Sequence, residues 1–111
     1  MSVAESEGPN GVTVIRIEGQ LVVSNRQELK DLVNHALDEG ARKFLLDFSG
    51  AGYIDSSGLG ALVSLSKRAR ELGGELRLSG LNEDLRSLFE LTKLDTLFAI
   101  ADTPDQALAG F

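Results

Sequence analysis

The chain has 111 residues, 42% hydrophobic and 25% charged, a composition that predicts one globular domain rather than a disordered chain. Its 17 acidic and 11 basic side chains give a formal net charge of −6, which argues against nucleic acid as a partner because phosphate backbones bind basic surfaces. The absence of cysteine excludes disulfide and thiolate chemistry and fits a cytoplasmic location.

The N-terminal segment MSVAESEGPNG is polar and acidic, so we expect no secretory signal and a flexible tail over residues 1–10. Residues 12–17 (VTVIRI) alternate in polarity and predict a first strand. Gly19 marks a turn or bulge, and residues 20–23 (QLVV) predict a second strand that forms a hairpin with the first.

The first helix is predicted to begin at Ser24 or Asn25, which form overlapping capping patterns with Gln27 and Glu28, and to end at Gly40. Its apolar positions follow helical spacing: Leu29, Leu32, Val33, Ala36 and Leu37. Residues 43–48 (KFLLDF) form a short, nearly continuous apolar run, which is typical of a buried central strand.

A second helix is predicted to follow the stretch YIDSSGLGAL and to end at Gly73-Gly74. Its expected buried stripe is Leu59, Leu62, Val63, Ser66, Ala69 and Leu72. Residues 75–79 then alternate as a strand, Asn82 caps a helix that runs to Thr92, and residues 97–101 form a last strand. Thr103 followed by Pro104 predicts a final helix.

The predicted order is ββαβαβαβα in a single α/β domain spanning residues 1–111. Strands joined by single helices imply right-handed crossovers and parallel neighbours. We therefore expect a small mixed sheet of about four to five strands, with the first two as a hairpin and the rest mostly parallel, covered by about four helices. No apolar run approaches the roughly 18–20 residues that span a bilayer, so no membrane insertion is expected.

The stretch YIDSSGLGAL, residues 53–62, places hydroxyls and glycines where a helix should start, and catalysis is a poor explanation for it. The single histidine, His35, lies on another predicted helix, and the G-x-S-x-G elbow of serine hydrolases is absent. The spacing around Gly58 and Gly60 matches neither the dinucleotide fingerprint nor the Walker loop. One histidine, no cysteine and dispersed carboxylates, among them Asp47 and Asp55, give no metal-ligand spacing, so no metal or cofactor is expected.

A phosphate-accepting serine is chemically sensible at this position. Free backbone amides at a helix start can receive a phosphate, and the helix dipole favours its charge by about 0.3–1 kcal/mol. The residues alone leave open whether Ser56 and Ser57 are modified or simply cap the helix. They also leave open whether Gly58 and Gly60 admit a partner or pack against a strand.

The same residues resemble the signature of the bacterial STAS-domain family, and of its anti-sigma factor antagonists in particular. The likeness covers nearly the whole chain and is most specific in Asp55-Ser56-Ser57-Gly58-Leu59-Gly60. Weaker matches are Gly19-Gln20-Leu21, the 44–48 strand, Gly73-Gly74 and the helix containing Leu88-Phe89. One position departs from the family, because an aspartate often found directly after the Gly-x-Leu of the second strand is replaced here by Val22.

The resemblance implies a non-enzymatic partner switch. The unphosphorylated antagonist would bind an anti-sigma factor that is also a serine kinase, and phosphorylation of Ser56 would release it until a phosphoserine phosphatase restores it. Asp55 would order the turn, Ser57 would help to cap the helix, Gly58 and Gly60 would leave room for the kinase, and Leu59 would be the first core anchor. We expect a monomer or weak dimer. The alternative is a non-catalytic STAS subunit or scaffold of a larger complex, stressosome-like or lipid-transporting.

Overall fold

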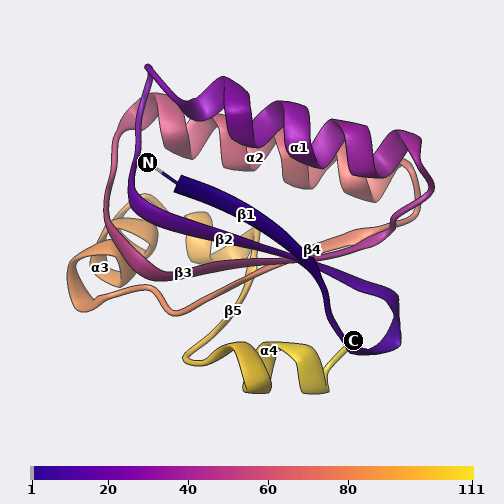
Figure 1. The fold of residues 1–111 in the computed structure, drawn as a ribbon. Coiled ribbons are helices and arrows are strands. Elements are labelled where there is room, and N and C mark those ends of the chain that lie inside the picture. Colours follow the sequence, from indigo (N-terminus) through magenta and orange to yellow (C-terminus); the bar gives the residue numbers. More distant parts are fainter. Residues whose placement is uncertain (1) are drawn as a thin grey trace.

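The computed structural model describes residues 2–111, which fold into a five-stranded sheet with helices on both sides (Figure 1). Neighbouring strands pair in chain order, with β1 antiparallel to β2 and the remaining pairs parallel. The predicted order ββαβαβαβα is confirmed. The elements are β1 (Ser2–Glu7), β2 (Val12–Leu21), α1 (Arg26–Asp38), β3 (Lys43–Ile54), α2 (Ser56–Glu71), β4 (Glu75–Ser79), α3 (Glu83–Leu91), β5 (Ala99–Ala101) and α4 (Pro104–Ala109), with 3-10 turns at Pro9–Gly11 and Leu94–Thr96.

The expected flexible tail is wrong for the residues described, because residues 2–7 form edge strand β1. It pairs with β2 across a turn in which Asn10 and Gly11 both adopt positive φ. The hairpin is therefore β1–β2, and the two strands predicted within residues 12–23 are one long strand. Gly19, at φ 88°, lies at a register irregularity inside β2, so it is a bulge and not a hairpin turn.

The central position of β3 follows from its sequence, as predicted. The run from Phe44 to Phe48 is buried between the helical layers. Helices α1 and α2 lie side by side on one face of the sheet, and α4 covers part of the other (Figure 1). Asp47 is buried within this run, and its Oδ1 accepts bonds from the amide and hydroxyl of Ser49, which satisfies part of its polarity.

The predicted helical stripes are mostly confirmed. In α1 four of the five predicted positions are buried, and Leu32 is half-buried. In α2 the stripe is rotated, so that Ala61 and Leu65 are buried while Leu72 remains 41% exposed. Because Leu72 is the C-cap residue of α2, it lies beyond the last turn that contacts the sheet. The caps at Asn82 and Thr103 form as predicted, with bonds from the amides of Leu85 and Gln106.

Candidate functional site

The Asp55-Ser56-Ser57 turn connects the end of the central strand to α2, at the carboxyl edge of the parallel sheet. Ile54 is the last residue of β3 and pairs in register with Leu21, the last residue of β2. The two strands end together, so the loop after β2 lies beside the turn (Figure 1). Functional loops gather at this edge of open α/β sheets.

Asp55 holds the turn together and is the N-cap of α2. Its Oδ1 accepts a 2.8 Å bond from the amide of Gly58, and its Oδ2 accepts a 3.1 Å bond from the amide of Val23. Its own amide donates to the carbonyl of Leu21 at 3.1 Å. One side chain therefore caps the helix and fastens the neighbouring loop, which agrees with the ordering role expected of it.

The two serines occupy different environments. Ser56, the first residue of α2, is exposed, whereas Ser57, the second, is half-buried. The expectation that Ser57 caps the helix is wrong, because the cap residue precedes the first helical residue and that position belongs to Asp55. Ser56 is exposed at the helix start, where the first backbone amides have no acceptor within the helix, and Asp55 accepts from one of them, the amide of Gly58.

Gly58 and Gly60 also differ. The sequence left open whether they admit a partner or pack against a strand, and the structure gives a different answer for each. A Cβ on Gly58 would lie 2.5 Å from the carbonyl oxygen of Leu21 and 2.9 Å from Cγ2 of Ile54. Gly58 is buried, so tight packing against β2, rather than access for a partner, explains it. Gly60 is exposed, and a Cβ there would meet nothing within 4 Å, so this position is open to an approaching surface. Leu59 is partly buried against the main core, as expected of an anchor.

Two exposed apolar side chains lie near the turn, one in the loop after β2 and one at the end of β3, and neither was predicted from the sequence to be at the surface. Val23 is 64% exposed, and Tyr53, which pairs with Gln20 in the neighbouring strand, is 56% exposed. Asn25 shapes this loop by accepting from the amide of Val22 and donating to the carbonyl of Gln20. Asn25 was expected to cap α1 through its side chain; it occupies the N-cap position, but its side chain makes no cap bond because these two loop contacts engage it.

Catalytic and metal-binding groups are not assembled at the turn. His35 lies nine residues past the start of α1, about 13 Å along the axis, and approaches Glu39 at 3.8 Å. It is therefore not placed to act as a base for Ser56. Within residues 2–111 no group of three or more histidine, aspartate or glutamate side chains is arranged to hold a metal ion. No helix in the same range is long and apolar enough to cross a membrane.

The sequence was also compared with models of known protein families. The STAS-domain model matches residues 3–107. The chain belongs to the STAS-domain family. The resemblance to STAS domains that the sequence indicated is thereby confirmed over almost the whole chain.

Relatives of this STAS domain share a consistent description. A Bordetella bronchiseptica protein named as an anti-sigma factor antagonist, BtrV, is 28% identical over 92% of this chain and 88% of its own length. The Staphylococcus aureus anti-sigma-B factor antagonist is 28% identical over 78% of this chain and 80% of its own. A crystal structure of a Thermotoga maritima protein, also described as an anti-sigma factor antagonist, superposes with a TM-score of 0.91 at 28% identity, covering 97% of this chain and 92% of that one.

The double contact of Asp55 gives a first testable prediction. In Asp55→Asn, the remaining carbonyl oxygen can still accept from Gly58, but the amide group cannot accept from Val23 in the geometry of Oδ2. We expect Asp55→Asn to speed hydrogen exchange at the Val23 amide while costing less stability than Asp55→Ala, which also loses the cap worth about 1 kcal/mol. Amide exchange by NMR and thermal unfolding of both variants check this. Unchanged exchange at Val23 in both would show that Asp55 does not hold the loop.

Proposed function

We propose that this STAS domain is an anti-sigma factor antagonist whose binding is switched off by phosphorylation of Ser56. The observation that carries the proposal is an exposed serine hydroxyl at the first position of α2, in a turn held rigid by Asp55. The names of the relatives support the same regulatory role. In this role the unphosphorylated domain captures an anti-sigma factor and thereby frees the sigma factor.

The catalysis belongs to the partners. The anti-sigma factor would be a serine kinase that transfers the γ-phosphoryl group of ATP to Ser56, and a phosphoserine phosphatase would remove it. This chain is then substrate and ligand rather than enzyme, acting in the cytoplasm as a monomer or weak dimer. The surface that the kinase contacts comprises Asp55, Ser56, Leu59 and Gly60. Ser57 and the buried Gly58 support it from behind.

Phosphorylation changes the charge of this surface without requiring the fold to change. A phosphate adds about −1.5 to −2 charge at neutral pH. At the start of α2 the free amides and the helix dipole stabilise that charge, so the domain remains folded. The charge lies beside Asp55 on a chain whose formal net charge is already −6, so a partner surface matched to the neutral serine is repelled.

The two serines offer a direct test of the proposal, because Ser56 is exposed and Ser57 is half-buried. The domain is incubated with ATP and, in turn, each kinase-type anti-sigma factor of the source organism, and the phosphate is mapped by mass spectrometry. We expect one phosphate per chain on Ser56, retained in Ser57→Ala and lost in Ser56→Ala.

Label on Ser57 in the unaltered chain would contradict the assignment of the site. Absence of label with every kinase, together with co-purification in a large assembly, would instead support the non-catalytic scaffold role. That role draws some support from Val22, which replaces the aspartate frequent in the antagonists.

A further inference from the structure

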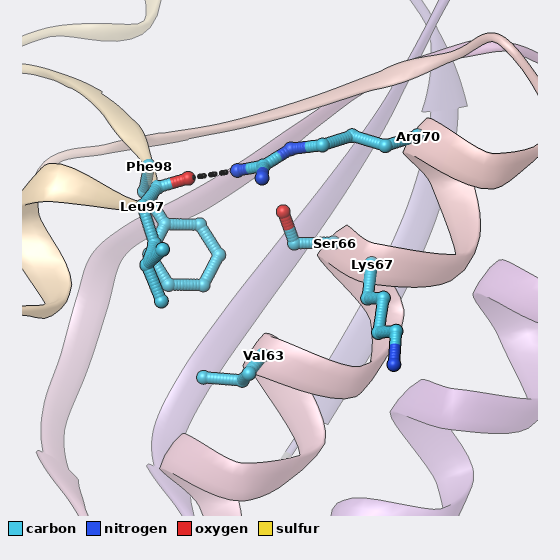
Figure 2. Close-up of a pocket in the computed structure, with 6 residues that line it drawn as sticks. All are labelled: Val63, Ser66, Lys67, Arg70, Leu97 and Phe98. Atoms are coloured by element: carbon cyan, nitrogen blue, oxygen red, sulfur yellow. Dashed lines mark hydrogen bonds between the residues drawn. The ribbon is translucent and has the colours of Figure 1, made fainter.

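A second surface of α2 forms a small pocket with the segment that precedes β5 (Figure 2). Its lining residues from α2 follow helical spacing, and the opposite wall comes from two consecutive residues before β5. They are Val63, Ser66, Lys67 and Arg70 on one side and Leu97 and Phe98 on the other. The volume is about 180 Å³. Typical pockets for drug-sized ligands are about 300–1,000 Å³, so this one fits a ligand of about six to ten non-hydrogen atoms.

The walls of the pocket are fixed by packing and by one side-chain bond. Phe98 is buried and packs edge-to-face on Phe89, with ring centroids 5.8 Å apart. The guanidinium of Arg70 donates to the carbonyl oxygen of Leu97 and so ties the two walls together across the opening (Figure 2). Because these contacts hold both walls in place, binding should cost little ordering of the pocket.

The pocket is lined by apolar side chains, one hydroxyl and two basic side chains. Val63, Leu97 and Phe98 provide apolar contact, and the hydroxyl of the buried Ser66 points toward the Arg70 guanidinium (Figure 2). Both charged lining residues, Lys67 and Arg70, are basic, although the chain as a whole has a formal net charge of −6. An arginine that uses one N–H on a carbonyl retains further donors for a carboxylate.

We infer that this pocket binds a short-chain aliphatic monocarboxylate, of about four to six carbons, with its carboxylate on the Arg70 guanidinium and the Ser66 hydroxyl and its alkyl chain on Val63 and Phe98 (Figure 2). The basic rim disfavours a cationic ligand, and a purely apolar one would make no use of the N–H donors that Arg70 retains. The site lies seven or more residues from Ser56, about 10 Å or more along α2. It is separate from the phosphorylated turn and does not depend on the proposed switch.

The inference is tested with hexanoate, added to the full chain while amide and methyl NMR signals are followed. We expect saturable shifts centred on Val63, Ser66 and Phe98, with a Kd of about 1 mM. Hexylammonium, which has the same alkyl chain and the opposite charge, should give no saturable shift, and hexanol should bind at least about 5-fold more weakly than hexanoate.

Variants then test the cationic rim. Arg70→Gln should weaken hexanoate binding about 10-fold, because it removes a charge-assisted bond. Lys67→Gln should weaken it only about 2-fold, because the exposed Lys67 ammonium points away from Arg70 and acts only as a nearby charge (Figure 2). Lys30→Gln on α1, which removes the same charge elsewhere, should leave the affinity unchanged. Absence of saturable shifts at 20-fold above the expected Kd, equal binding of hexylammonium, or an unchanged Kd in Arg70→Gln would each overturn the inference.

Discussion

Ser56→Asp should lose about 10- to 100-fold in affinity for the anti-sigma factor, measured by calorimetry against the partner that phosphorylates the unaltered chain. In the proposed complex, the partner surface approaches closely at Ser56, which is exposed at the first position of α2. A carboxylate there places a second negative charge next to Asp55 inside the contact, where like charges and desolvation both oppose binding. The phosphorylated chain, with about twice the added charge, should bind more weakly still.

Two control variants test whether the loss of affinity depends on the position of the added charge or only on the total charge of the chain. Ser56→Ala removes the phosphate acceptor but adds no charge, and it should keep the affinity of the unaltered domain. Ser64→Asp adds the same charge at an exposed serine on α2, two turns away, and should change affinity less than about 3-fold. Equal affinities of Ser56→Asp and Ser56→Ala would refute an electrostatic switch at this residue.

Loss of binding in Ser56→Asp should not arise from unfolding. An acidic residue in the first turn of a helix is stabilised by the helix dipole by about 0.3–1 kcal/mol. The melting temperature of Ser56→Asp should therefore equal or slightly exceed that of the unaltered domain. This behaviour fits a switch that changes surface charge while the fold persists.

Much of this fold was predictable because its central elements obey simple patterns. The apolar run at residues 44–48, the helical spacing in α1, and the caps at Asn82 and Thr103 each appear as the sequence predicts. In α2 the helix is as predicted, although its buried stripe is rotated. The place of the turn was predictable for the same reason, since the end of a buried strand and the start of an amphipathic helix both mark it. The proposed role of Ser56, in contrast, rests on the resemblance to STAS domains.

Other features depend on contacts between distant segments, which local patterns do not encode. Strand β1 has one large apolar residue, Val3, and is held as a strand by its pairing with β2. The bond from Val23 to Asp55 joins residues 32 positions apart. Gly58 and Gly60 look equivalent in the sequence, yet one faces Leu21 and the other faces solvent, because they lie on different sides of the helix.

The glycine pair gives the largest stability prediction. Gly58→Ala would place a Cβ 2.5 Å from the carbonyl oxygen of Leu21, and that atom belongs to the backbone, which cannot move aside cheaply. We expect the overpacking to outweigh the gain in helix propensity and to destabilise the domain by about 1–3 kcal/mol. Gly60→Ala, with nothing within 4 Å of its Cβ, should stabilise α2 by about 0.5–1 kcal/mol.

Chemical denaturation of the two variants should measure a difference of about 1.5–4 kcal/mol between identical substitutions two residues apart. Equal stabilities would mean that α2 shifts away from β2 without cost and that Gly58 is not required for their contact. Affinity for the anti-sigma factor should depend more on position 60 than on position 58, because Gly60 is on the proposed contact surface and Gly58 is behind it. Gly60→Trp should weaken capture of the anti-sigma factor without lowering stability by as much as Gly58→Ala, since bulk at an open surface position hinders the partner and not the core.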